Sequence, residues 1–279
     1  MSLIGISPQS GERKTAVVRG GGDLATGVIY RLWRARFDVL CLETERPMTV
    51  RRPVSVAQAV FDGEHTVENM TARLIGARED FRPVAERGEI PVLVDPEGLC
   101  IDKIKPDLLV DAIMAKRNTG THNKMARLVL AIGPGFCAPR DAHGVIETKR
   151  GHTLGRLITE GEAIANTGIP GMEMGYTVER LLRAPARGQV EPLREIGERV
   201  AAGAMIATVG GEELRAGIPG VLRGLIHPSV TVEPGCKIGD VDPRNEPSHC
   251  FTITDKALAI GGGVLEAVLS IGVSENESA

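Results

Sequence analysis

Residues 15–27 read Thr-Ala-Val-Val-Arg-Gly-Gly-Gly-Asp-Leu-Ala-Thr-Gly, an apolar run that leads through three glycines into a helix-spaced segment. The apolar run predicts a buried parallel strand, and the apolar residues after the glycines share one face of a 3.6-residue period. Strand, glycines and helix therefore come in the order of a dinucleotide-binding turn. The alternative is a tight turn that leads into a buried helix.

Small residues in this stretch have distinct expected roles. Gly20 can make the tight turn, Gly22 lets the backbone approach a pyrophosphate, and Ala25 allows close packing of helix on strand. The carboxylate of Asp23 would repel a pyrophosphate unless it turns away to cap the helix. We expect these residues of the turn to bind a cofactor: Gly20, Gly21, Gly22, Asp23, Ala25 and Gly27.

A second apolar run, residues 37–42, ends in Glu43, 21 residues after Gly22. An acidic residue about 20 residues beyond the glycines is suited to bind the hydroxyls of a ribose. The sequence therefore predicts that Glu43 contacts the ribose of a bound nucleotide.

The amino-acid composition indicates what kind of protein this is and which partners it is unsuited to bind. The chain has 279 residues, is 42% hydrophobic and carries a formal net charge of -3, as expected of a globular protein with room for two domains. The absence of a global positive charge and an aromatic content of 3% argue against a nucleic-acid or membrane partner. Five cysteines without CxxC spacing and no signal-peptide pattern favour a cytoplasmic protein with reduced thiols.

Further apolar runs at residues 92–95, 108–111 and 128–132 predict more buried strands of the same sheet, with ligands at its carboxyl edge. From residue 184 to 244, short apolar pieces alternate with glycine and proline, which is typical of an all-β module. There Val-x-x-Gly-x-x-Ile occurs at residues 200–206 and again at 232–238. This repeat resembles the two halves of a lipoyl or biotinyl carrier, although the interval 208–217 holds Arg215 and no lysine to modify.

The expected fold class is α/β, with a Rossmann-like, mostly parallel sheet and a second, smaller all-β barrel-sandwich domain of lipoyl/biotinyl-like shape without a modifiable lysine. We expect the nucleotide-binding domain over residues 14–182, with the placement of 116–182 open, and the barrel-sandwich module over 183–250. Residues 251–279 are expected to form a helix that docks on the α/β domain, followed by a disordered tail.

Two basic segments are candidates for phosphate binding. Arg51 and Arg52 could clamp a phosphate bidentately, or could form a solvated pair on a loop. Lys116, Asn118 and Thr119 follow a predicted strand and offer a cation, an amide and a hydroxyl to an anion. The same residues could equally form a turn.

Glu147 and His152 are the best candidates for acid-base chemistry, with Glu147 as a base and His152 as an acid or a substrate ligand. A metal bound by Asp141 and His143 is conceivable, but the spacing is weak and we assign no metal. Cys137 could be a nucleophile, but a small buried thiol is the simpler interpretation.

Six strings in order along the chain resemble the selenium-dependent molybdenum hydroxylase accessory proteins of the YqeB type. They lie at residues 19–27, 111–120, 133–136, 146–152, 166–171 and 237–244. The glycine-rich turn also looks like that of the XdhC maturation factors, which carry a Rossmann domain and handle molybdenum cofactor. The resemblance implies a role in maturing a molybdenum hydroxylase.

The main functional hypothesis is therefore an accessory protein that binds an unknown nucleotide, either NAD(P) or a molybdopterin nucleotide, and a molybdenum hydroxylase partner. An alternative is an NAD(P)-dependent oxidoreductase that acts on a small metabolite. A further alternative is a non-enzymatic assembly scaffold. A homo-oligomer is the default expectation for each.

Overall fold

The computed structural model describes residues 13–168 and 171–274. The disordered tail expected at the end of the chain falls on residues 275–279, outside the described residues, as do Ile169 and Pro170 of the fifth string.

In the described residues, nine strands form the largest sheet, in the order β10-β9-β7-β6-β1-β2-β5-β4-β3. Their bounds are β1 Thr15–Arg19, β2 Asp38–Glu43, β3 Glu64–Val67, β4 Met70–Ile75, β5 Ile90–Val94, β6 Leu108–Asp111, β7 Leu128–Ile132, β9 Gly144–Ile146 and β10 Leu157–Ile158. The strands from β9 to β4 are parallel, whereas β10 and β3 pair antiparallel at the two edges. The chain therefore builds the sheet outward from β1 in both directions.

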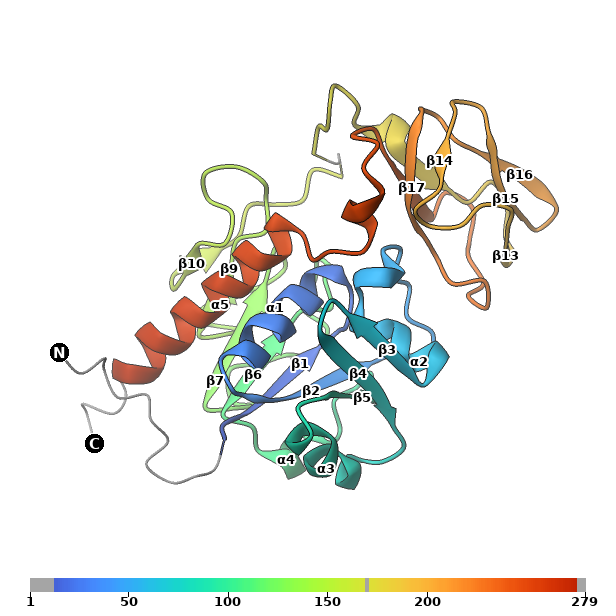
Figure 1. Cartoon of the computed structure of the whole chain (residues 1–279). Coiled ribbons are helices and arrows are strands. Elements are labelled where there is room, and N and C mark those ends of the chain that lie inside the picture. The colour runs from blue at the N-terminus through green and yellow to red at the C-terminus, as the bar shows by residue number, and fades with distance from the viewer. Residues whose placement is uncertain (1–12, 169–170, 275–279) are drawn as a thin grey trace.

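Helices cover both faces of this sheet (Figure 1). One face is covered by α1 (Asp23–Arg34) and α5 (Asp255–Ser274), and the other by α3 (Phe81–Glu86) and α4 (Ile101–Ile104). The short helices η1 Arg52–Val54, η2 Val56–Gln58, α2 Ala59–Asp62 and η3 Arg78–Asp80 complete this part of the chain. Complete burial of side chains such as Leu40 and Ile132 contributes about 1.5–3 kcal/mol each.

Helix α1 forms because Val28, Ile29 and Leu32 are buried on one face, while acidic Asp23 and basic Arg34 lie at the ends that favour their charges. The backbone leaves the helix through Arg36, whose φ is 68°. As a result the helix starts directly behind the three glycines and at the carboxyl edge of the sheet.

Residues 181–242, here called the β module, fold into two small antiparallel sheets. One has the order β12-β18-β17-β14 and the other β13-β15-β16, and a separate pair β11-β8 belongs to the α/β part. The bounds are β8 Cys137–Ala138, β11 Gly161–Glu162, β12 Leu181–Arg183, β13 Val190–Pro192, β14 Arg199–Val200, β15 Met205–Val209, β16 Glu212–Arg215, β17 Gly220–Leu225 and β18 Lys237–Asp242. The short helices η4 Val178–Arg180 and η5 Pro247–Cys250 flank the module.

The repeat seen in the sequence corresponds to two equivalent turns. Gly203 and Gly235 have φ of 78° and 79°, and each turn leads into a buried isoleucine, Ile206 or Ile238. The two following strands, however, lie in different sheets, β15 in the three-stranded and β18 in the four-stranded one.

The expected fold class needs correction. The large sheet is mixed: its seven inner strands are parallel, and an antiparallel strand lies at each edge, so it is not the Rossmann-like sheet that was expected. The β region consists of separate small antiparallel sheets, and no lipoyl/biotinyl-like barrel-sandwich is shown by the described residues. The physical reason is that glycine-bounded apolar runs predict strands and turns, whereas their pairing partners depend on contacts between distant segments.

Candidate functional site

The glycine-rich turn joins β1 to α1 at the point where the sheet grows in two directions. β1 pairs with β2 on one side and with β6 on the other. The loops that follow neighbouring strands diverge there, which makes this edge the expected ligand site of an open α/β sheet.

The three glycines differ in what they permit. Gly20 has φ of 96°, and a Cβ on it would lie 2.8 Å from the carbonyl oxygen of Ala112, so no other residue fits easily. A Cβ on Gly21 would lie 2.9 Å from the backbone nitrogen of Ala57. Gly22, in contrast, has φ of -65° and its nearest neighbour would be Thr49 at 3.8 Å, which leaves open space beside the start of α1.

The carboxylate of Glu43 is fixed against this turn. Its two oxygens accept hydrogen bonds of 2.7 Å from the backbone N–H groups of Gly21 and Thr44. Burial raises the pKa of Glu43, and these hydrogen bonds oppose the rise. The Thr44 hydroxyl also donates to Oε2, at 3.4 Å. The side chain is therefore held in one orientation at the end of β2, and Oε1 keeps a further lone pair for a ligand.

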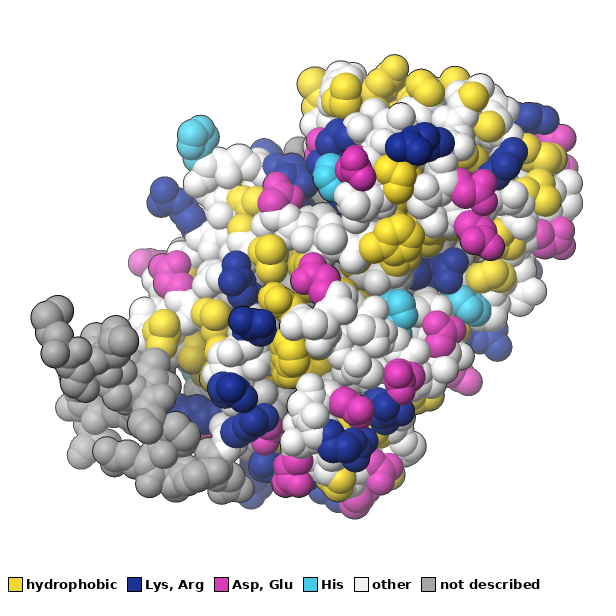
Figure 2. All heavy atoms as spheres, in the orientation of Figure 1, with side chains coloured by type: hydrophobic (Ala, Val, Ile, Leu, Met, Phe, Trp, Pro, Cys, Tyr) yellow, Lys and Arg dark blue, Asp and Glu magenta, His cyan; other side chains and the backbone are white. Residues whose placement is uncertain are grey.

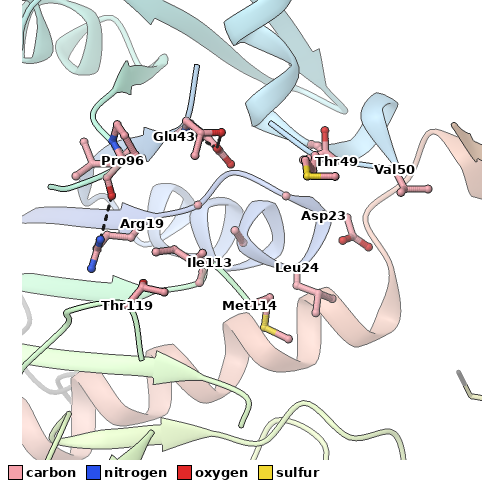
Figure 3. Close-up of a pocket in the computed structure, with 18 of the residues that line it drawn as sticks. Arg19, Asp23, Leu24, Glu43, Thr49, Val50, Pro96, Ile113, Met114 and Thr119 are labelled. Carbon is pink, nitrogen blue, oxygen red and sulfur yellow. Dashed lines mark hydrogen bonds between the residues drawn. The ribbon is translucent and has the colours of Figure 1, made fainter. Parts of the chain in front are cut away.

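A cavity of about 610 Å³, here called the turn chamber, opens beside the glycines. Figure 3 shows Glu43 and Asp23 at the two ends of the turn, with Ile113 and Met114 across the cavity. The expected cofactor-binding residues that line it are Gly20, Gly22, Asp23, Ala25, Glu43, Arg51 and Thr119.

A buried network that the sequence analysis missed closes one end of the turn chamber. Arg19, at the end of β1, donates to Thr121 Oγ1 at 2.6 Å and to the carbonyl of Pro96 at 3.1 Å. The Thr121 hydroxyl donates in turn to Asp111, which also pairs with Arg19 at 3.7 Å. Burial raises the pKa of Asp111, against the effects of Thr121 and Arg19. The available signal was an arginine at the end of a buried strand.

Asp23 does not cap α1, since no side-chain hydrogen bond caps that helix. Its carboxylate instead lies 3.6 Å from the guanidinium of Arg51. Arg51 is only 8% exposed and also donates to the carbonyl of His249. A cation thus offsets the negative charge that would otherwise face a bound phosphate.

The other expected cofactor-binding residues lie outside the turn chamber. Gly21 contacts it only through its bond to Glu43, and Gly27 packs against the backbone of Ala257 in α5. Arg52 donates to the carbonyl of Leu225 at 2.7 Å, toward the β module. Asn118 holds its own loop through Gly120 and Thr121, and Lys116 lines a neighbouring cavity.

The two expected acid-base residues, Glu147 and His152, differ in burial and in their contacts. Glu147 is 2% exposed and accepts hydrogen bonds from the backbone N–H groups of Thr148, Lys149 and Ile164. His152 is exposed and lines neither cavity described here. Glu147 thus organises a loop in this structure, and a catalytic role for either residue stays a prediction.

The candidate metal and nucleophile positions have other contacts. Asp141 accepts from Arg140 and from the backbone of Cys137, and His143 Nδ1 accepts from the backbone of Val129. Among residues 13–168 and 171–274, no group of three or more His, Cys, Asp or Glu is arranged to hold a metal ion. Within the same ranges all five cysteines are free thiols, and no helix is long and apolar enough to span a membrane.

A second cavity of about 430 Å³, here called the basic chamber, adjoins the first. It lies between the α/β part and the β module, and five residues line both cavities: Asp23, Leu24, Arg51, Met114 and Lys237. Its other charged lining residues are Lys116, Lys149, Arg150, Glu173, Arg180, Arg223, Asp240 and Lys256.

Burial and the nearby Arg150 lower the pKa of Lys256. Arg180, Arg223, Asp240 and Lys256 were not anticipated, because they come from segments far from the glycines.

Comparison with known proteins gives one close relative. The chain is 49% identical over 255 residues to the Uncharacterized protein YqeB of Escherichia coli (strain K12). This chain is a homologue of that protein. The match covers 91% of this chain but 47% of the relative, so the chain spans about half the length of the curated protein it matches. No protein-family model matches the chain.

Solved structures give only distant similarity. The apo Ectoine utilization protein EutE (DoeB) from Ruegeria pomeroyi is 11% identical, with 82% of this chain and 86% of that chain covered and a TM-score of 0.24. A succinylglutamatedesuccinylase/aspartoacylase from Rhodobacter sphaeroides is 16% identical, with 83% and 85% covered and a TM-score of 0.27. Scores this low support no inference about the reaction of this chain.

These comparisons correct the main functional expectation. The similarity to YqeB supports the relationship expected from the six strings, but the name of the relative states no activity. None of the comparisons supports a role as a molybdenum hydroxylase accessory protein or an XdhC-like protein. The accessory role and the molybdopterin nucleotide are therefore not carried further.

Proposed function

We propose that this protein is an enzyme acting on a small metabolite with the help of a dinucleotide of the NAD type, which binds in the turn chamber. The observation that carries the proposal is the position of Glu43 at the end of β2, bonded to Gly21 of the turn that starts α1. A ribose at Glu43 and a pyrophosphate at Gly22 would then lie along one continuous surface.

The start of α1 supports the placement of the pyrophosphate. A helix N-terminus offers free N–H groups and a partial positive charge to an anion. The open space at Gly22 lets a phosphate reach these groups, and Arg51 lines the same cavity. The cavity volume of about 610 Å³ is also in the range usual for small-molecule sites.

Glu43 also favours NAD over NADP. The carboxylate can accept hydrogen bonds from the ribose hydroxyls, whereas the 2′-phosphate of NADP would place like charges together. Bound nicotinamide would supply a hydride acceptor or donor. Lys256, whose pKa is lowered by burial in the adjoining basic chamber, is the group that we propose takes part in proton transfer.

The test is isothermal titration of NAD, NADP and ATP into the wild-type chain and Gly22→Val. The backbone of Gly22 is extended and its Cβ position is open, so valine should be accommodated in the fold while it fills the phosphate space. Gly76→Val is a matched control, because a Cβ there meets nothing within 4 Å and the residue lies outside the turn chamber.

We expect NAD to bind more tightly than NADP, and Gly22→Val to weaken NAD binding by at least about tenfold while Gly76→Val leaves it unchanged. If Gly22→Val binds NAD like the wild type, the site is misplaced. If none of the three nucleotides binds the wild-type chain, the non-enzymatic scaffold becomes the better hypothesis.

A further inference from the structure

The basic chamber concentrates positive charge in a protein whose formal net charge is negative. Eight cationic and three acidic side chains line it, although the formal net charge of the chain is -3. On the molecular face shown in Figure 2, basic and acidic side chains of the described residues are interspersed. The excess of positive charge is therefore a local property of this cavity.

Two buried arginines lie at the centre of this excess. Arg51 comes from the α/β part and Arg223 from β17 of the β module, and their side chains are 9% and 7% exposed. The positive charge of Arg223 is among the influences that lower the pKa of Arg51, after burial itself, so the two guanidinium groups are close enough to repel each other. Bringing two like charges together in a buried site costs free energy unless an anion joins them.

The contacts of Arg223 do not satisfy its guanidinium. It lies 3.9 Å from Asp240 and 3.6 Å from Asp242, longer than hydrogen bonds, and its Nε has no hydrogen-bond partner among the described residues. Both carboxylates are engaged more closely by other arginines. Arg180 donates to Asp240 at 2.8 Å, and Arg244 donates to Asp242 through its Nε at 2.9 Å.

The Nε atoms of Arg51 and Arg180 likewise have no hydrogen-bond partner within the described part of the chain. Buried donors are normally paired, and the planar fork of arginine matches the oxygens of phosphate and carboxylate groups. Thr148, which is 5% exposed, and the exposed Lys149 add a hydroxyl and a further cation to the wall.

We propose that the basic chamber is a binding site for a small, multiply charged anion that carries phosphate or carboxylate groups, held between Arg51 and Arg223. The site goes beyond the proposed dinucleotide site and does not depend on it. Because Arg51, Asp23 and Lys237 line both cavities, an anion bound here would lie next to whatever occupies the turn chamber.

The experiment is isothermal titration of the full chain, without nucleotide and at constant ionic strength, with four probes: inorganic phosphate, inorganic pyrophosphate, succinate and citrate. The test variant is Arg223→Met. The matched control is Arg215→Met, which removes the same charge from an exposed arginine of β16 that pairs with Glu213 outside the chamber. Circular dichroism establishes that each variant is folded.

We expect saturable binding of at least one probe at one site per chain, weakened at least tenfold by Arg223→Met and unchanged by Arg215→Met. Tighter binding of pyrophosphate identifies a phosphate ligand, and tighter binding of citrate or succinate a carboxylate ligand. If Arg223→Met does not fold, Lys149→Met replaces it, with an expected loss of about threefold because Lys149 is exposed.

Absence of binding by all four probes overturns the proposal, as does equal weakening by Arg223→Met and Arg215→Met, which indicates a diffuse charge effect. Gly22→Val separates the two sites. It should leave binding of the anion unchanged, so loss of NAD binding with retained anion binding confirms that the chambers are distinct.

Discussion

Protonation of Glu43 should make the free energy of unfolding of the protein depend on pH. Burial raises its pKa above the ordinary value of 4.5, so the folded chain holds this proton more tightly than the unfolded chain. Its contribution to stability is therefore full below about pH 4.5 and is lost as the pH rises through the raised folded-state pKa. Glutamine at this position does not titrate.

We therefore predict that the free energy of unfolding of the wild type, minus that of Glu43→Gln, falls as the pH rises from about 4.5. Urea denaturation of both proteins at a series of pH values measures this difference. A difference that stays constant, or that grows with pH, would show that the environment of Glu43 is not the one described.

At the scale of single residues, sequence reasoning succeeds where one local pattern carries the information. Glu43 was selected from its spacing to the glycines, and its carboxylate accepts from Gly21 of the turn, while its contact with a ribose stays a prediction. Arg19 belongs to the same stretch, but its role depends on Thr121, 102 residues away. Arg223 is recognisable only once β17 is placed against the loop that holds Arg51. No local spacing encodes such contacts.

At the scale of elements, the crossing of α1 and α5 depends on glycines that face each other. A Cβ on Gly261 would lie 2.5 Å from the carbonyl oxygen of Gly27, and one on Gly27 would lie 2.5 Å from the backbone of Ala257. The helices approach so closely that a methyl group has no room. Gly262, the next residue of α5, has nothing within 4 Å.

Gly261→Ala should therefore destabilise the protein by about 1–3 kcal/mol through overpacking. Gly262→Ala should stabilise it by about 0.5–1 kcal/mol, because alanine loses less backbone entropy in a helix. Urea denaturation of the two variants measures both effects. Equal effects of the two substitutions would contradict the close crossing.

Elements with a continuous apolar run were predictable. The buried strands β1, β2, β5, β6 and β7 all occur where the sequence indicates them. The hairpin of β3 and β4 was not expected, because only one of the four residues of β3 is buried and the strand has no apolar run. In the β module the turns were recognised, but the expected lipoyl/biotinyl-like barrel-sandwich was wrong.

At the scale of the whole molecule, side chains join the β module to the α/β part. The ring of Phe61 in α2 stacks on His227 of the module with centroids 3.9 Å apart. Burial and the charge of Arg52 lower the pKa of His227, so the neutral ring is favoured in this stack. Its contribution to stability is present above about pH 6.5 and is lost as the pH falls through the lowered folded-state pKa.

We predict that His227→Phe, which keeps a stacking ring but cannot be protonated, removes this dependence. The melting temperature of the wild type should fall relative to that of His227→Phe between about pH 6.5 and 5. Differential scanning calorimetry of both proteins across this range provides the measurement. Parallel curves would indicate that the stack does not sense the charge of the imidazole.

The single tryptophan of the chain, Trp33, lies near the end of α1 and donates its indole N–H to the carbonyl of Gly88 at 2.8 Å. Its fluorescence thus originates entirely in the α/β part, whereas circular dichroism registers both parts of the chain. Comparison of the two signals during denaturation will show directly whether the β module unfolds together with the helix that starts at the glycine-rich turn or separately from it.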